Sequence, residues 1–309
     1  MILNTGCRTD IPAFYSTWFY NRIKEGFVCT RNPYRPELVR KYQLSPDVVD
    51  VLCFCTKNPQ PMLPRLKELK EFRQFWFVTL TPYGKEIEPH VPDKKEVLSS
   101  ILELSSVVGE KAIGWRYDPI FLTEKYSISY HLRAFEKIAS ILQNHVGFCV
   151  ISFLDLYVKT KRNFPSAREV GTKEQEYLTL KLAEIGLKYG IKVRTCCEDS
   201  LLAKYGVDVS GCRTKEVLEA ATNCRFVVPK NVKSPRTKCN CLLGSDIGRY
   251  NTCPHACVYC YANEDQRRVQ ENRKSHDPNS PFLIGGFREG DKVIEARQVS
   301  YLDRRITLF

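Results

Sequence analysis

The sequence lacks the patterns that place a chain in a membrane or on a secretory route. No run of apolar residues approaches the roughly 20 residues that a membrane-spanning helix needs. The first residues contain no basic stretch followed by an apolar one, so no signal peptide is predicted. A glycine-rich phosphate loop and a Ser–His–Asp arrangement are also missing. We therefore expect a cytoplasmic protein without a membrane partner, whose chemistry depends on other residues.

The chain has instead a large apolar content and an excess of positive charge. Its 309 residues, 43% of them hydrophobic, suffice for one large domain or two ordinary ones. The formal net charge of +12 favours polyanions such as nucleic acid or phosphorylated small molecules. The basic residues are spread along the chain, however, with only short clusters such as Lys159–Arg162. A solvated basic surface therefore explains the charge more simply than a nucleic-acid footprint does.

Strand-like and helix-like segments alternate along the first two thirds of the chain. The apolar, β-rich runs are Ile2–Cys7, Phe27–Thr30, Val49–Cys55, Gln74–Leu80, Lys111–Trp115, Gly147–Phe153 and Lys192–Cys196, with a weaker one at Arg225–Val228. The amphipathic stretches are Pro12–Glu25, Met62–Phe72, Lys94–Val108, Ser129–Asn144, Lys173–Tyr189 and Thr214–Thr222. This alternation predicts an α/β fold of parallel βαβ units. Seven or eight units favour a TIM-like parallel barrel, complete, incomplete or permuted, with a doubly wound open sheet as the competing topology.

Charged and polar residues follow almost every predicted strand. In a parallel barrel these exits converge on the face that carries the active site. The candidates for acid–base or ionic roles there are Asp10, Arg116 and Asp118, and the candidates for holding a cofactor are Arg8, Lys57 and Asp155. Arginine suits carboxylate and phosphate groups because its donors form a fork, and the aspartates could pair with the cations or hold hydroxyl groups. A structural ion-pair network around the barrel mouth is the alternative.

Fourteen cysteines need explaining in a compartment where disulfides are rare. Cys253, Cys257 and Cys260 have three and then two residues between them, so their thiolates can reach three corners of a [4Fe–4S] cube. Because no fourth cysteine completes the run, one iron would lack a protein ligand and could hold a substrate. A structural zinc ion is the alternative, with Cys239, Cys241 or His255 as the fourth ligand.

A second set of cysteines lies among polar residues of the last third. Its members are Cys197, Cys212, Cys239 and Cys241. Four such thiols could hold a second [4Fe–4S] cluster or a zinc ion, or they could be unlinked. Cys196 and Cys197 point to opposite faces of a strand, so one of the two is expected in the core. The change of pattern near Pro229 predicts a barrel domain over residues 1–228 and a cluster-bearing segment over 229–309 that packs on the barrel mouth.

The run Cys253-Pro-His-Ala-Cys257-Val-Tyr259-Cys260 resembles the signature of the radical S-adenosylmethionine enzymes, with Tyr259 in the aromatic position. The resemblance implies that S-adenosylmethionine chelates the open iron and is cleaved to a 5′-deoxyadenosyl radical, and that Tyr259 lies at the cofactor. It also implies a reductant such as flavodoxin or ferredoxin. Spore photoproduct lyase shows that such enzymes can act on nucleic acid.

The wider sequence resembles an uncharacterised family, a domain of unknown function with a radical-enzyme-like cluster at its C-terminus. The matching motifs are Arg8–Pro12, Thr56–Pro59, Thr79–Tyr83, Trp115–Pro119, Cys239–Cys241, Asp246–Tyr250 and Cys253–Asn263. This resemblance covers most of the chain but implies no reaction. The chain departs from radical enzymes in two ways: the cysteines follow the last predicted strand rather than the first, and the usual Gly-Gly-Glu is absent. Asp10 or another strand-end carboxylate could replace that glutamate.

The sequence therefore predicts a radical S-adenosylmethionine enzyme that acts on an unidentified small molecule, nucleotide or nucleic acid. The main alternative is a non-catalytic or zinc-dependent nucleic-acid-binding protein in which the cysteines are structural. A cluster used only for electron transfer is a third possibility, and it would not respond to S-adenosylmethionine.

Overall fold

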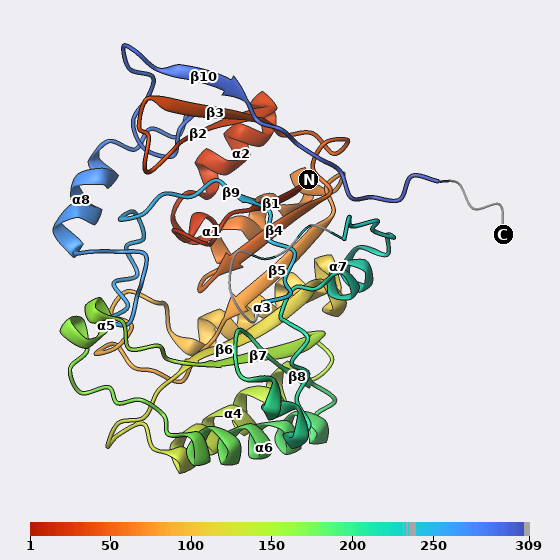
Figure 1. Cartoon of the computed structure of the whole chain (residues 1–309), viewed down its shortest axis with the longest axis vertical. Coiled ribbons are helices and arrows are strands. Elements are labelled where there is room, and N and C mark those ends of the chain that lie inside the picture. Colours follow the sequence, from red (N-terminus) through yellow and green to blue (C-terminus); the bar gives the residue numbers. More distant parts are fainter. Residues whose placement is uncertain (231, 233, 235–238, 306–309) are drawn as a thin grey trace.

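A parallel sheet forms the centre of the molecule (Figure 1). The computed structural model describes residues 1–230, 232, 234 and 239–305. The seven strands of this sheet lie in the order β8-β7-β6-β5-β4-β1-β9, and all neighbours are parallel. They are β1 Ile2–Asn4, β4 Val51–Thr56, β5 Gln74–Thr79, β6 Ile113–Ile120, β7 Phe148–Phe153, β8 Lys192–Thr195 and β9 Ser245–Asp246. The predicted α/β fold with a parallel sheet is confirmed.

The central sheet is open, so the TIM-like barrel of the prediction does not close. Strand order follows the chain from β1 through β4 to β8, as in a barrel, but the edge strands β8 and β9 do not pair. Irregular segments lie between the two edges instead. Asp208 bridges to Arg194 on β8, and the Leu242 N–H donates to the Arg213 carbonyl at 2.9 Å. Closure needs a complete set of staggered strands, and these segments supply isolated bridges and hydrogen bonds rather than a strand.

Two of the predicted strands do not belong to the central sheet. Phe27–Thr30 belongs to a separate three-stranded sheet, in which β2 (Phe27–Arg31) is antiparallel to β3 (Leu38–Gln43) and β10 (Lys292–Glu295) is parallel to β3. The link between β2 and β3 is too short for a parallel crossover, so a hairpin forms. Arg225–Val228 forms no strand and makes only an isolated bridge.

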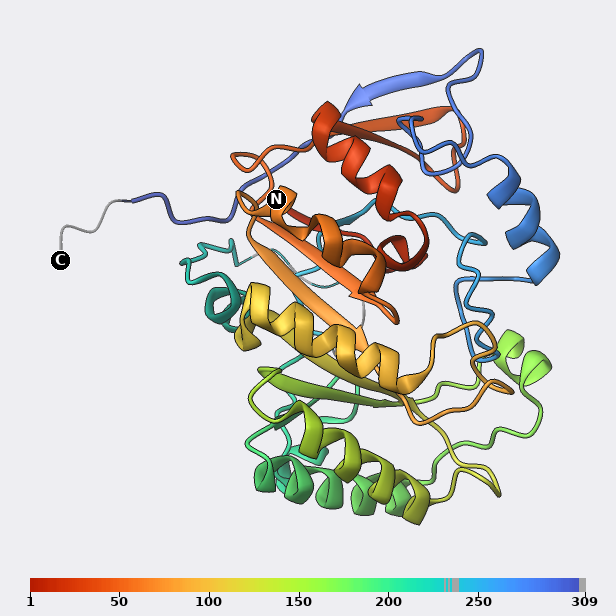
Figure 2. The same cartoon turned by 180° about the vertical axis from the view of Figure 1, so that it is seen from behind.

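Helices cover one face of the central sheet. Figure 2 shows α3, α4 and α6 side by side on this face. The helices are α1 Ile11–Phe14, α2 Ser16–Glu25, η1 Gln60–Leu69, α3 Lys94–Val108, η2 Glu110–Ala112, α4 Ile128–Leu142, α5 Val158–Asn163, α6 Thr172–Lys188, η3 Ser200–Tyr205, α7 Lys215–Thr222 and α8 Gln266–Lys274. Within the described ranges, none of them combines the length and the apolar character that crossing a bilayer requires.

The central sheet is buried on both faces, as parallel sheets are. Alternate residues of β5 show this: Trp76 and Val78 pack in the core beneath the helices, whereas Phe75 and Phe77 pack on the opposite face. On that opposite face they meet Leu218 of α7. Because apolar side chains fill most of both faces, the polar side chains of the candidate site lie at the C-terminal ends of the strands.

His131 of α4 is a buried neutral base in the helix-covered core. Its Nε2 lies 2.9 Å from the Phe121 carbonyl and must carry the proton, so Nδ1 accepts from the Tyr117 hydroxyl at 2.9 Å. Burial lowers the pKa of His131 from 6.5 to about 4, and the bond to the carbonyl offsets only part of this. The rings of Tyr83, Tyr117 and Tyr130 face the imidazole.

His131 therefore makes stability depend on pH between about 4 and 6.5. In this window the unfolded chain binds a proton that the folded chain does not bind, so the stabilisation is complete above pH 6.5 and is lost as pH falls towards 4. The loss approaches about 1.4 kcal/mol per pH unit. We expect urea unfolding of His131→Gln to show a shallower fall in stability from pH 6.5 to 5 than wild type. A His145→Gln control should keep the wild-type slope, and equal slopes in all three proteins would contradict the assignment.

Candidate functional site

The loop that carries Cys253, Cys257 and Cys260 packs against the C-terminal ends of β1, β4 and β5. Its backbone binds the chain that follows β5: Val258 N donates to the Ile87 carbonyl at 3.0 Å, and the carbonyl of His255 accepts from His90 N at 3.1 Å. From the other side, the hydroxyl of Tyr15 donates to the Thr252 carbonyl at 2.6 Å. The cysteine loop therefore lies at the edge where the strand-end residues were expected to meet.

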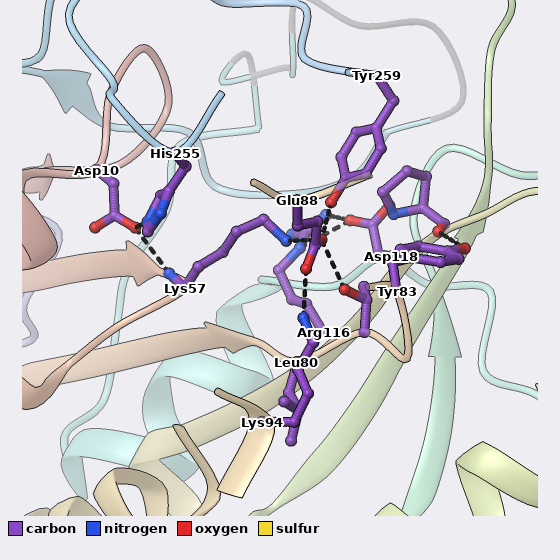
Figure 3. Close-up of polar contacts among 12 residues, drawn as sticks. Asp10, Lys57, Leu80, Tyr83, Glu88, Lys94, Arg116, Asp118, His255 and Tyr259 are labelled. Atoms are coloured by element: carbon purple, nitrogen blue, oxygen red, sulfur yellow. Dashed lines mark hydrogen bonds and ion pairs between the residues drawn. The ribbon is translucent and has the colours of Figure 1, made fainter. Parts of the chain in front are cut away.

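Asp10 joins two strand ends to the cysteine loop (Figure 3). It follows β1 and caps α1, where its Oδ1 accepts from Ala13 N at 3.0 Å. Its Oδ2 accepts from the backbone N–H of Lys57, just after β4, at 2.8 Å, and it lies 2.8 Å from Nε2 of His255. The side chain of His255, a candidate fourth ligand in the zinc alternative, thus lies within hydrogen-bond distance of Asp10.

Glu88 is the centre of the polar network, and sequence reasoning did not identify it. Its Oε1 accepts from Lys57 Nζ at 2.7 Å, from Thr81 Oγ1 at 2.7 Å and from the Tyr259 hydroxyl. Its Oε2 pairs with Lys94 at the start of α3. Figure 3 shows Lys57 from the exit of β4, Lys94 from the start of α3 and Tyr259 from the cysteine loop converging on this carboxylate. In the sequence, Glu88 could be noticed only as an acidic residue in the loop that follows a predicted strand.

Two lysines determine the protonation state of Glu88. Its side chain is 1% exposed, and burial alone would raise the pKa of the carboxyl. The charges and hydrogen bonds of Lys57 and Lys94 outweigh burial and hold the pKa at about 2, so Glu88 is an anion at neutral pH. One carboxylate therefore faces two ammonium groups, and the charge of Lys57 opposes part of the rise that burial causes in the pKa of the Cys257 thiol. This charge favours an anionic metal–thiolate centre.

Arg116 and Asp118 form a neighbouring ion pair on β6. Asp118 Oδ2 accepts from Arg116 Nε at 2.9 Å, and Oδ1 accepts from the Ser152 hydroxyl on β7. On the other side of the guanidinium, Nη1 of Arg116 lies 4.0 Å from the sulfur of Cys212. The pair is thus partly committed to structure, and it lies between the polar network and a second group of thiols.

Two other candidates from the sequence do not join the Glu88 network. Arg8 Nε pairs with Asp246 of β9 at 2.6 Å. Asp155 is exposed, and its carboxylate accepts from the neighbouring Tyr157 hydroxyl at 3.1 Å. The network therefore contains Asp10, Lys57 and Tyr259 of the predicted set.

The cysteine loop has features of a functional site. Ala256 has a φ of +60°, a left-handed conformation that costs a non-glycine residue about 1 kcal/mol or more. The sulfur of Cys260 accepts from Ala262 N at 3.3 Å. Two buried polar atoms near the loop, Thr9 Oγ1 and Asn263 Oδ1, have no hydrogen-bond partner among the residues that the structure describes. A bound group could satisfy these atoms, since buried polar atoms are rarely left unpaired.

Two thiols of the loop, those of Cys253 and Cys257, are neutral when no metal is bound. Burial raises the pKa of Cys253 well above its usual value, and burial raises that of Cys257 to about 12 although Lys57 opposes the change. Metal binding at these residues would therefore release protons. Among the described residues, no group of three or more His, Cys, Asp or Glu converges where a single metal ion could sit. A cluster does not require such convergence, because its thiolates bind different irons.

A second group of thiols lies on the face of the sheet opposite the helices. Cys212 Sγ is 3.4 Å from that of Cys241 and 3.6 Å from that of Cys196. Cys239 packs against the same apolar cluster, and Cys197 interacts with Cys196. The structure thus brings together Cys212 and Cys241 of the predicted set and adds Cys196, which had been considered as a core residue.

Sequence comparison assigns the chain to a family without revealing a reaction. Residues 2–262 match the family described as "Domain of unknown function (DUF1848)", and the chain belongs to this family. The match includes Cys253, Cys257 and Cys260 but ends before α8 and β10. Neither the curated proteins nor the solved structures contain a match.

The Glu88 network should dominate the stability of this edge of the sheet. Glu88→Gln leaves Lys57, which is 14% exposed, and the more exposed Lys94 without their shared counter-ion, and breaking a buried pair costs about 3–5 kcal/mol. We expect urea unfolding of the metal-free protein at pH 7 to show a loss of this size. Glu86→Gln is the matched control: Glu86 also pairs with a lysine, but its side chain is 49% exposed, so the loss should stay below about 1 kcal/mol. Similar losses in both variants would contradict the role of Glu88.

Proposed function

We propose that this member of the DUF1848 family binds a [4Fe–4S] cluster through Cys253, Cys257 and Cys260 and uses it to cleave S-adenosylmethionine. The observation that supports the proposal most is the position of the cysteine loop. It lies at the C-terminal ends of parallel strands, where α/β enzymes bind their ligands. Tyr259, the aromatic residue of the motif, donates to the buried carboxylate of Glu88.

The donor set fits the proposed group. Three half-buried thiols in one loop can bind three irons and leave the fourth open to a ligand. When bound, such a cluster supplies one electron to the sulfonium of S-adenosylmethionine and yields a radical that abstracts hydrogen from a substrate. The unpaired oxygens of Thr9 and Asn263 lie where a ligand at the loop could satisfy them.

The surrounding residues orient the loop and its ligand. Asp10 binds both His255 and the backbone at the exit of β4. The cysteine loop is therefore anchored to the sheet through His255. The amine of a bound methionyl group needs an acceptor, and the usual Gly-Gly-Glu is absent. Glu88 suits this role because, within the described part of the chain, its Oε2 accepts only from Lys94 and so keeps lone-pair capacity. Lys57 and Lys94 keep this carboxylate ionised.

The first prediction of the proposal concerns iron and 5′-deoxyadenosine. Anaerobic reconstitution with iron and sulfide, reduction and addition of S-adenosylmethionine should give a paramagnetic resonance spectrum that the cofactor perturbs, together with 5′-deoxyadenosine. Cys257→Ala should lose the cluster and the product. Cys224→Ala, which lies outside both thiol groups, should keep both. Zinc without iron would favour the nucleic-acid-binding alternative, and a cluster indifferent to S-adenosylmethionine would favour electron transfer.

We also propose that Cys196, Cys212 and Cys241, with Cys197 and Cys239 nearby, hold a second metal as a cluster or a zinc ion. The observation behind this is Arg213, a buried guanidinium. It donates to the Leu242 carbonyl at 3.1 Å and to the Asn4 amide oxygen, and among the described residues it has no acidic partner. A buried cation requires a counter-charge, and thiolates bound to a metal would provide one.

The second site can be tested in a protein without the first. The variant in which Cys253, Cys257 and Cys260 are all alanine should still carry iron or zinc after reconstitution. Adding Cys212→Ser should remove that metal, whereas adding Cys224→Ser should not. Elemental analysis gives the metal content of each protein. A triple variant that binds no metal would show that the second group consists of unlinked thiols.

A further inference from the structure

An arginine-rich cavity of about 470 Å³ adjoins the cysteine loop. It lies between β2, the chain that follows β9, and α8, all in the upper part of Figure 1. Its charged lining consists of Arg8, Arg31, Arg249, Arg268, Arg288 and Glu271. Five cations against one acid give the cavity a strong positive potential, and its volume is in the range of small-molecule sites.

Three of the five arginines are neutralised by carboxylates outside the lining. Arg8 pairs with Asp246 at 2.6 Å, as described above. Arg31 pairs with Asp291, with Nη2 at 2.8 Å from Oδ2. Arg268 pairs with Glu264 one turn before it. These three arginines shape the cavity, but their charge is largely balanced.

Arg249 and Arg288 are not balanced in this way. Arg249 is half-buried, its guanidinium donates from Nη1 to the Ile284 carbonyl at 3.3 Å, and no described acid forms an ion pair with it. Burial lowers its pKa, and the charges of Arg288 and Arg31 lower it further. Arg288 is exposed and has no ion pair within the described ranges; the Asp291 carboxylate, which is shared with Arg31, accepts from its backbone N–H at 2.8 Å and balances only part of its charge. Two cations that repel each other at a cavity wall are stabilised by an anion between them.

We infer that this cavity binds the phosphate group of a nucleotide-sized ligand. Arg249 and Arg288 supply two positive charges, which match a phosphomonoester with its charge of about −1.5 to −2 better than a carboxylate with one. Tyr250 also lines the cavity and is 42% exposed; the guanidinium of Arg8 lies over its ring at 5.8 Å, and a base can stack on the ring's other side. S-adenosylmethionine is a poor match, because arginines repel its sulfonium.

The cavity and the cysteine loop are parts of one structure. The Thr252 hydroxyl donates to the Arg249 carbonyl at 2.6 Å, immediately before Cys253. On the far side of the loop, Asn263 Nδ2 donates to the Cys253 carbonyl at 2.7 Å. The ligand is therefore assigned as the substrate of the radical chemistry, and this part of the inference rests on the proposed function. Binding itself does not depend on it.

The test is calorimetric binding to the anaerobically reconstituted protein. The ligands are 5′-AMP, adenosine, and a ten-nucleotide single strand with and without a 5′-phosphate. We expect 5′-AMP or the phosphorylated strand to bind at least tenfold more tightly than its unphosphorylated counterpart. Preference for AMP would identify a free nucleotide as the ligand, and preference for the strand would identify a nucleic-acid end. Equal binding with and without phosphate, or no binding of any of the four, would overturn the inference.

Two variants and a control locate the binding site. Arg249→Gln and Arg288→Gln should each weaken binding of the phosphorylated ligand at least tenfold. Because Arg288 is exposed, its substitution should not disturb folding, and it tests the site even where Arg249→Gln impairs folding. Arg133→Gln on α4 removes the same charge away from the cavity and should bind as wild type does. Unchanged binding in both cavity variants would refute the site.

Formation of 5′-deoxyadenosine without phosphate binding would refute this inference alone, and phosphate binding without 5′-deoxyadenosine would refute the proposed radical function alone.

Discussion

The arrangement of the candidate site depends on one buried carboxylate. Glu88 accepts hydrogen bonds from Lys57, Lys94, Thr81 and Tyr259, which come from separate segments of the chain. Desolvating an acid and two ammonium groups is unfavourable unless they meet with good geometry, so their pairing fixes the relative positions of the segments that carry them. The cysteine loop is one of these segments. Its position on the sheet is thus determined by an electrostatic requirement in addition to apolar packing.

Unbalanced arginines point to groups that the chain itself does not supply. Arg213 faces the second thiol group, and Arg249 faces the cavity beside the cysteine loop. Neither has an acidic partner among the residues that the structure describes, whereas Arg8 and Arg31, which lie close by, are paired. Folding rarely tolerates an uncompensated buried cation. The simplest physical account is that metal-bound thiolates compensate the first and a ligand phosphate compensates the second.

Local patterns allowed much of the fold to be predicted, but contacts between distant segments did not follow from them. Helix α3 has the predicted bounds Lys94–Val108, because its apolar residues repeat at helical spacing and Asp93 caps its start. By contrast, β9 has only two residues, Ser245 and Asp246, and no strand propensity to reveal it. Glu88 was missed for a related reason, since its partners Lys57 and Tyr259 are identified only by the tertiary fold.

The short strand β9 also bears on the unusual order of the cysteine motif. In radical enzymes the motif follows the first strand, whereas here it follows the last strand of the central sheet. Because β9 pairs in parallel with β1, the chain leaving β9 emerges beside the exit of β1. Asp10 of that exit then reaches His255 within the motif. A motif late in the sequence can thus occupy the same edge of the sheet as one placed after the first strand, and the order of the chain is no physical objection to cluster chemistry.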